Sequence, residues 1–268
     1  VGDNLYGKAR VATISGSSVS FGTEVTFFSD RVDSLTSSYD PVENKTLVVI
    51  GSSTATPTSG IVAATISGTS VSFGTLGDLG DLFSGNAHLG SVYNSNAGKI
   101  VVCGLDSQSN GAAAVGKFTS TGTNLTSENY IGMSSGVVDV ESQTEDIGSA
   151  VVFNNAGNTT KPHLCFDTSN NKVVIGFVDN ALTEKGSAIV GTVSGTSISF
   201  GTEEVFSFTN NDPIEIAYHA GEGRVVVIYK NGGNSNYGTA LTGLVSGTSI
   251  AFGSPVVFNS ASTGSMAI

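Results

Sequence analysis

Ser194-Gly195-Thr196-Ser197-Ile198-Ser199-Phe200-Gly201-Thr202 is the stretch that decides the fold, because the chain repeats it. Close copies begin at Ser15, Ser67 and Ser246. A fifth, weaker copy is split by an insertion, and Gly148 lies in its second half. Five copies in one chain indicate a repeat protein in which each unit packs against its neighbours.

The Phe-Gly pair sets the length of the unit. Its glycines are Gly22, Gly74, Gly148, Gly201 and Gly253. They are separated by 52, 74, 53 and 52 residues, and the long interval contains the insertion. The glycine of Ser-Gly-Thr-Ser supplies the positive φ of a tight hairpin turn, so each copy predicts two antiparallel strands. The alternation Ile198-Ser199-Phe200 turns one face to a core, and we expect Phe200 and its counterparts to pack between units.

Two more strands follow each hairpin. The first ends in an aromatic residue, and a basic residue comes six positions later in every copy. The aromatic residues are Tyr39, Tyr93, Phe166 and Tyr218. The second strand is the most apolar segment of the unit, as in Thr46–Ile50 and Val173–Val178. Such continuous β-branched runs fit a strand that is covered on both faces.

Four antiparallel strands in a unit of about 52 residues predict an all-β chain in which residues 1–268 form a single β-propeller domain. The chain contains five copies of each hairpin strand, four of each other strand and a partial strand at its end. One more strand makes five blades of four, so five blades are expected. Six or seven blades with a part missing are the alternative, followed by an open solenoid or a stacked β-sandwich array. The repeats also predict that the chain is a segment of a longer protein.

Composition limits the partners of such a fold. Charged residues make up 12% of the chain, and its net charge is −11. Nucleic acids and anionic membranes bind clustered Lys and Arg, which this chain lacks, so we expect neither partner. No apolar run approaches the roughly 20 residues of a membrane span. Cys103 and Cys165 lie in apolar strands and are expected to be buried thiols, with a disulfide as the alternative.

An insertion at about residues 123–146 is the one departure from the repeat. It is acidic, and insertions in repeat proteins form loops on one face, which is often the face that binds. The predicted binding residues are Glu128, Tyr130, Asp139 and Glu141. We expect a protruding hairpin that contacts a partner or a cation. The alternative is a surface insertion without a function, because a longer loop costs little.

Catalytic chemistry has weak support in the sequence. Some propellers are glycoside hydrolases, which need a pair of carboxylates, and the candidates are Asp33, Asp212 and Glu215. These residues lie at unequal places in the repeat, and the chain has no Trp to form a sugar platform. We therefore expect no enzyme activity and assign no catalytic residue.

Metal binding is equally weakly indicated. The histidines His88, His163 and His219 occupy three different places relative to the strand-end aromatic residue, so no metal site is predicted. Calcium is the most plausible ion, because oxygen-rich loops occur at one place in the repeat. These loops are Asp106-Ser107, Asp179-Asn180 and Asn231-Gly232-Gly233-Asn234. The alternative is that their Asn and Asp residues only form turns, and no cofactor is assigned.

The units also carry a resemblance. Residues Phe166–Ile175, Gly191–Thr202, Ser254–Ser260 and Asn124–Gly132 resemble propeller-like repeats in virion proteins of marine tailed phages. The resemblance implies a structural or adhesive module of a tail fibre on the virion surface, outside the cell. It implies contacts with other virion proteins or with further copies, and binding to a host-surface glycan or protein. A bacterial surface adhesin with the same repeat style is an alternative, as is a propeller glycoside hydrolase.

Overall fold

The fold was analysed in a computed structural model of the chain, which describes residues 5–56, 58–79, 83, 88–106, 108–122, 141–155, 159–180, 184–209, 211 and 213–268. Side chains are described for all of these except residues 78 and 117–147. Every regular element in this part of the chain is a β-strand, as the sequence predicts.

The strands fall into five successive units. Unit 1 is a hairpin of interrupted strands, with β1 (Gly7–Ala9) and β2 (Ala12–Ser15) before the turn and β3 (Ser18–Phe21) and β4 (Val25–Phe28) after it. Units 2 to 5 are four antiparallel sheets of one design, whose strands follow one another in sheet order from the inner to the outer strand.

Their bounds are as follows. Unit 2 contains β5 (Ser34–Asp40), β6 (Lys45–Gly51), β7 (Ser59–Ser67), β8 (Ser70–Phe73) and β9 (Gly77–Asp78). Unit 3 contains β10 (Gly90–Asn94), β11 (Lys99–Leu105), β12 (Gly111–Gly122), β13 (Glu141–Ile147) and β14 (Val151–Asn154). Unit 4 contains β15 (Thr159–Asp167), β16 (Lys172–Asp179), β17 (Lys185–Ser194), β18 (Ser197–Phe200) and β19 (Glu204–Ser207). Unit 5 contains β20 (Ile214–His219), β21 (Arg224–Asn231), β22 (Tyr237–Ser246), β23 (Ser249–Phe252) and β24 (Val256–Ser262).

The outer strand of each unit is broken in two at the Phe-Gly glycine, where the sequence predicted one continuous strand. In unit 4 both pieces, β18 and β19, pair with β17. Between them, the amide of Gly201 donates a hydrogen bond of 2.9 Å to the carbonyl oxygen of Val190. The equivalent glycine amides of the other four units make the same bond. The break is therefore part of the repeat.

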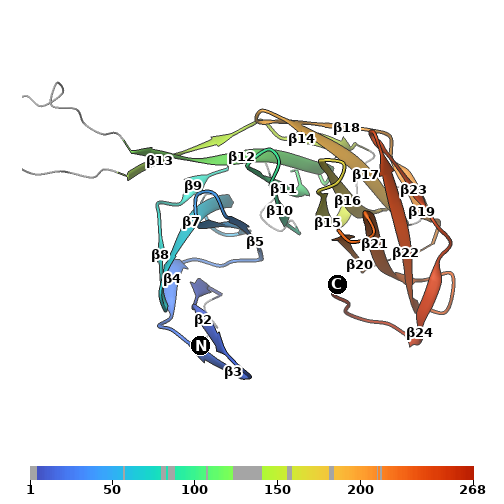
Figure 1. Ribbon diagram of the computed structural model, residues 1–268, viewed down its shortest axis with the longest axis horizontal. Coiled ribbons are helices and arrows are strands. Elements are labelled where there is room, and N and C mark those ends of the chain that lie inside the picture. Colours follow the sequence, from blue (N-terminus) through green and yellow to red (C-terminus); the bar gives the residue numbers. More distant parts are fainter. Residues whose placement is uncertain are drawn as a thin grey trace, which may run out of the picture.

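The units form a propeller-like arc. Figure 1 shows the inner strands β5, β10, β15 and β20 on the inside of the arc and the outer strands on its periphery, with units 1 and 5 at its two ends. The predicted numbers of strands are confirmed: five units have the hairpin strands, and four have the other two. The predicted partial strand at the end is wrong, because residues 263–268 follow β24 without strand structure. In the described residues the arc is open.

The second strands of units 2, 3 and 4 are covered on both faces, as their apolar runs predict, whereas Val226 and Ile228 on one face of β21 in unit 5 are only partly buried. In β16, the side chain of Val174 packs in the core between units 4 and 5. Its neighbours Val173 and Ile175 pack in the core between units 3 and 4. A single sheet has no way to bury both of its faces alone, so the stability of each unit depends on its neighbours.

Aromatic pairs connect neighbouring units. The ring of Phe206 in unit 4 lies edge-on to Phe252 of unit 5, with ring centroids 5.3 Å apart. Phe153 and Phe200 form the same kind of pair between units 3 and 4, at 5.6 Å. Phe27 stacks on Phe73 between units 1 and 2. The phenylalanine of each of these Phe-Gly pairs therefore packs between units, as expected.

The glycine of the Phe-Gly pair leaves room for the next unit. A Cβ atom on Gly201 would lie 1.9 Å from the carbonyl oxygen of Thr248, in the Ser-Gly-Thr-Ser turn of unit 5. Gly22 and Gly148 have the same relation to Thr69 and Thr196, at 1.9 and 1.7 Å. No side chain fits in this space, so glycine is required by the contact between units.

This contact predicts the effect of a single methyl group. Gly201→Ala should lower the free energy of unfolding by about 2 kcal/mol or more, because the turn of unit 5 must move away. Gly253→Ala is the matched control, since the nearest atoms to a Cβ atom at Gly253 are 3.7 Å away. It should change the free energy of unfolding by less than about 0.5 kcal/mol. Urea unfolding of both variants in dilute solution measures the difference, and equal losses would contradict the contact.

Cys103 and Cys165 are free and buried, as expected, and no disulfide joins them. Burial raises the pKa of each thiol to about 12, because it disfavours the thiolate. The folded chain should therefore react with an aromatic disulfide reagent at pH 8 only as fast as it unfolds. Absorbance measurements should detect both thiols at once in urea, and rapid labelling of the folded chain would show that the cores are open.

Candidate functional site

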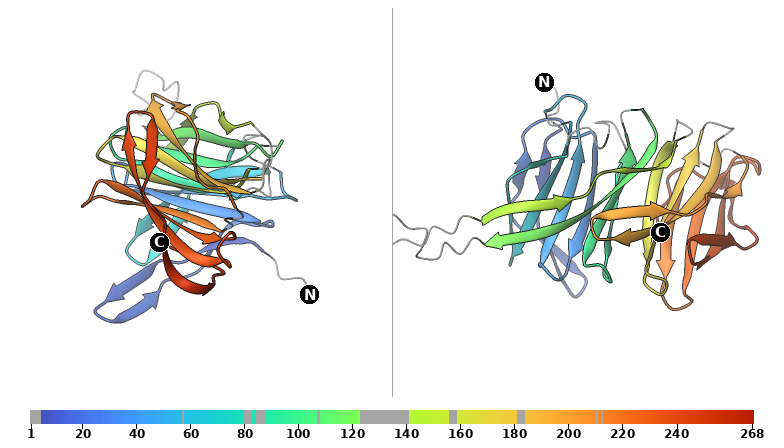
Figure 2. Two further views of the ribbon diagram at one scale, coloured as in Figure 1. Left: turned by 90° about the vertical axis from the view of Figure 1, so that its right-hand side faces the viewer. Right: turned by 90° about the horizontal axis from the view of Figure 1, so that it is seen from above.

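The insertion in unit 3 begins as a two-stranded arm. Strands β12 and β13 pair from Gly116 opposite Ile147 to Gly122 opposite Glu141. β13 has seven residues, whereas the outer strands β8, β18 and β23 have four after the turn. Figures 1 and 2 show this pair leading away from the body of the molecule. The outer strand of unit 3 therefore begins at Glu141. The sequence had predicted that it begins at Ile147.

One of the four predicted binding residues lies in this described arm. Glu141 is the first residue of β13, and its backbone pairs with Gly122. Glu128, Tyr130 and Asp139 lie outside the described residues. The structure thus describes the base of the arm and the direction in which it leaves the sheet.

An acid–base pair lies between units 4 and 5. The Nδ1 atom of His163, on β15, is 3.2 Å from the Oε2 atom of Glu215, on β20. Both residues were considered separately in the sequence, one as a metal ligand and one as a catalytic carboxylate. They share a place in the repeat, because each comes three residues before the strand-end aromatic residue, Phe166 or Tyr218. That shared place is the signal that would have predicted the pair.

Hydroxyl groups occupy the corresponding junction between units 2 and 3. The Oγ atom of Ser91, on β10, lies 2.9 Å from the Oγ1 atom of Thr36 and 2.8 Å from the Oγ atom of Ser38, both on β5. The sequence analysis did not select these residues. The inner strands line the inside of the arc (Figure 1), and at both junctions they contact one another through polar side chains.

Asp33 is held by its own surroundings in the loop before β5. Its carboxylate accepts hydrogen bonds from the hydroxyl group of Ser53, at 2.6 Å, and from the amide of Ser53, at 2.7 Å. It also pairs with the guanidinium group of Arg31. The hydrogen bond from the Ser53 hydroxyl is the main cause of its lowered pKa, and the amide of Ser53 and Arg31 lower the pKa further.

The three carboxylates proposed for catalysis do not form a common site in the described residues. Asp33 lies in unit 2 and is engaged by Ser53 and Arg31, whereas Glu215 lies in unit 5 and faces His163. Asp212 is outside the described residues. A glycoside hydrolase needs two carboxylates on either side of one bond, and the described carboxylates show no such arrangement.

Two of the three loops considered for calcium use their oxygen atoms internally, whereas the Oδ1 atom of Asn180 in the third is buried without a hydrogen-bond partner among the described residues. Asp106 accepts hydrogen bonds from the amides of Gln108 and Asn110, at 2.8 and 2.9 Å. The side-chain oxygen of Asn231 accepts one from the amide of Gly233, at 3.1 Å. These contacts are those of turn-forming residues, which was the alternative interpretation. Among the described residues, no three His, Cys, Asp or Glu side chains gather closely enough to hold a metal ion.

The remaining two histidines lie elsewhere. Nδ1 of His219 accepts a hydrogen bond from the amide of Glu222 in the turn after β20. His88 lies in the loop before β10, whereas His219 is the last residue of β20. In the part of the chain that the structure describes, no helix has the length and hydrophobicity needed to cross a membrane.

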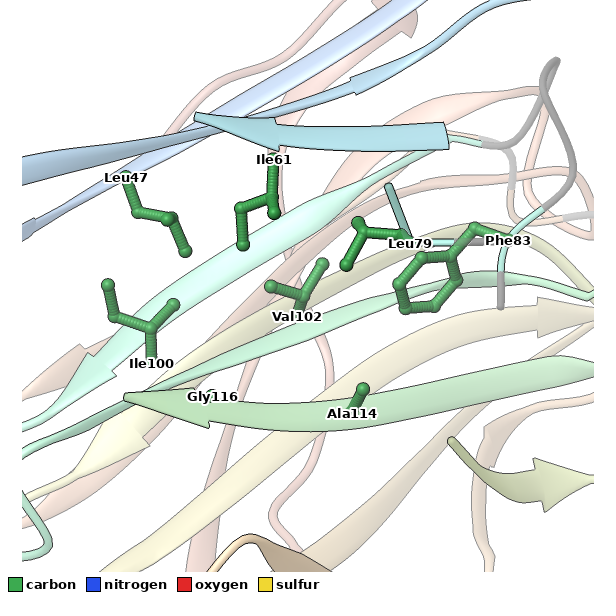
Figure 3. Close-up of a pocket in the computed structure, with 8 residues that line it drawn as sticks. All are labelled: Leu47, Ile61, Leu79, Phe83, Ile100, Val102, Ala114 and Gly116. Carbon is green, nitrogen blue, oxygen red and sulfur yellow. The ribbon is translucent and has the colours of Figure 1, made fainter. Parts of the chain in front are cut away.

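An apolar gap lies between units 2 and 3 (Figure 3). It is lined by Leu47, Ile61, Leu79, Phe83, Ile100, Val102, Ala114 and Gly116. Leu79 comes five residues after Gly74, the place that Phe27, Phe153 and Phe206 have in units 1, 3 and 4. The gap is the space left by the smaller side chain, and it offers a ligand no polar group.

Comparisons with known proteins leave the family open. No protein-family model matches the chain. No curated protein matches it either. Among solved structures, the chain is similar to the crystal structure of AofleA from Arthrobotrys oligospora, with a TM-score of 0.51 and 10% sequence identity. The match covers 98% of this chain and 74% of that one. This likeness concerns the fold.

The contacts of Asp33 predict a pH dependence. Because its pKa is lowered in the folded chain, its ionised form adds stability at pH values above the pKa of the unfolded chain, near 3.9. That stability is lost as the pH falls through the lower pKa of the folded chain. Asp33→Asn should therefore lower the free energy of unfolding by about 1 kcal/mol at pH 6, and the difference should shrink as the pH falls through the lowered pKa of the folded chain.

Urea unfolding at a series of pH values measures this effect. Glu204→Gln is the matched control, because this carboxylate is exposed at the start of β19. It should leave stability unchanged at every pH. A loss for Asp33→Asn that does not shrink as the pH falls would show that the amide disturbs the loop for another reason.

Proposed function

We propose that the chain is a non-enzymatic adhesive module of a virion surface, part of a phage tail fibre or a tail-associated protein that recognises the host. The observation that carries this proposal is the arm of β12 and β13, the one place where a closely repeated molecule departs from its pattern. The resemblance of the repeats to virion proteins of marine tailed phages supports the viral setting. The module lies outside the cell in this proposal.

The arm is the proposed contact with a host-surface glycan or protein. Its residues Glu128, Tyr130, Asp139 and Glu141 offer carboxylate acceptors and one aromatic ring. A glycan presents hydroxyl donors and apolar ring faces, which these groups complement. Other virion chains or further copies are the proposed structural partners, while the net charge of −11 argues against nucleic acid.

The proposal includes the absence of enzyme activity. Its support is the local engagement of Asp33 by Ser53 and Arg31 and of Glu215 by His163. It also includes a closed propeller. The number of strands alone favours five blades, whereas the exposed residues at the two ends of the arc favour six.

Replacing the arm tests the proposal. Residues 119–144 can be replaced by Ser-Gly-Thr-Ser, so that Phe118 and Glu145 take the places of Val193 and Ile198 in the regular hairpin. Because only the arm is removed, the variant should unfold within about 3 °C of the parent chain. Its binding to host cells and to a glycan array should fall at least tenfold.

Single substitutions refine the test. Tyr130→Ala in the arm should weaken binding, whereas Tyr39→Ala, the matched control at an exposed aromatic residue of unit 2, should leave it unchanged. An armless variant that binds as strongly as the parent chain would refute the adhesive role of the arm. Release of reducing sugar from host polysaccharide by the parent chain, lost in Glu215→Gln, would favour the glycoside hydrolase instead.

A further inference from the structure

The two ends of the arc expose residues whose counterparts are buried between units. At the end of unit 5, Phe258 comes five residues after Gly253, as Phe153 comes five after Gly148. Phe153 is 8% exposed and packs on Phe200, whereas Phe258 is 54% exposed. The end of unit 5 therefore carries half of an aromatic pair.

The space beside Gly253, the glycine that precedes this ring, is also not filled by another unit. A Cβ atom on Gly201 would meet the Thr248 carbonyl oxygen of the next unit at 1.9 Å. The nearest atoms to a Cβ atom on Gly253 belong to Thr242 of its own unit, at 3.7 Å. The end face of unit 5 thus has a glycine and a phenylalanine whose counterparts in other units contact the next unit.

Unit 1 carries the complementary half. Val19 is 55% exposed, whereas its counterpart Ile250 is 3% exposed in the core between units 4 and 5. Phe21 stands in the place of Phe252 and is 66% exposed. The turn at Gly16 and Ser17 corresponds to the turn that Thr248 contributes to the Gly201 contact. The end face of unit 1 therefore has the groups that insert into a preceding unit.

The hairpin of unit 1 also has an open edge. In units 2 to 5, the third strand pairs on one side with the second strand, as β22 does with β21. β1 and β2 pair only with β4 and β3 in the described part of the chain. The backbone groups on the other side of β1 and β2 correspond to the groups that pair with a second strand in units 2 to 5.

We propose that the two end faces and this edge form one docking site for a further four-stranded unit of the same repeat, followed by an inner and a second strand, in the same polypeptide. The junctions between units 1 and 2, 3 and 4, and 4 and 5 already show the contacts that would form at both faces. The addition makes six blades. Closure of this ring is independent of what the arm binds.

The length of the addition is compatible with the structural comparison. One unit of 52 residues and the two further strands amount to 67 residues. The match covers 74% of the solved chain, so about a quarter of that chain lies outside it, which is room for one such addition.

A chain extended with its own repeats tests this inference. Ile268 has the place of Ile216, because each comes fifteen residues after its Phe-Gly glycine. The extended chain therefore continues from Ile268 with a second copy of residues 217–268 and then of residues 217–231. It should remain monomeric by light scattering and unfold at least about 10 °C above the 268-residue chain, because both exposed faces become buried.

Hydrogen exchange locates the effect. Amides of β2 and β24 should exchange rapidly in the 268-residue chain and at least tenfold more slowly in the extended chain. The matched control is Gly253→Ala with Phe258→Ala. In the extended chain this pair should remove the gain, and in the 268-residue chain it should shift the unfolding temperature by less than about 3 °C.

Three outcomes would overturn the inference. An extended chain with no gain in stability or protection would show that the faces do not receive a unit. Slow exchange at β2 in the dilute 268-residue chain would show that this chain closes on itself with five blades. A 268-residue chain that associates with increasing concentration, and no longer does so with Phe258→Ala, would show that the faces bind a second copy.

Discussion

The approach of the Thr248 carbonyl group to Gly201 is the contact on which the rest of the structure depends. It brings the hairpin turn of one unit against the break in the outer strand of the unit before it. The same approach positions Phe252 beside Phe206, and it closes the core that covers the second strands. Because each contact is between backbone and backbone, it fixes the spacing of units more rigidly than interchangeable apolar side chains would. The contact recurs at Gly22, Gly148 and Gly201, so the glycine of the repeat is required whether Phe or Ile precedes it.

Much of the fold follows from the sequence, because its determinants are local and recur. The glycine turns, the strand-end aromatic residues and the basic residue at the start of each second strand all have the predicted places. The break at Gly201 was not predicted, because apolar alternation continues through it and only the neighbouring unit requires it. The partial strand at the end was predicted from the order of strands in the repeat, but a strand of this kind needs a second strand beside it.

Functional residues were harder to predict. The arm was found as an insertion, since a departure from a repeat is visible without knowledge of its partner. Its first strand residues were missed, because the pairing of Glu141 with Gly122 has no counterpart in the other units. The pairing of His163 with Glu215 was missed for another reason. In the sequence, histidines were compared only with histidines and carboxylates only with carboxylates. The contact joins a histidine and a carboxylate that have the same position in their repeats.

The break in the outer strand has a further consequence for the behaviour of the chain in solution. A chain rich in strands and poor in charge is prone to add strands at its exposed sheet edges, and so to aggregate. Here the outer edges of units 2 and 4 offer runs of no more than four residues before the backbone turns aside. Such short edges are poor templates for another strand. Strands β13 and β24 are seven residues long, so the arm and the end of unit 5 are the described edges long enough to pair with an added strand.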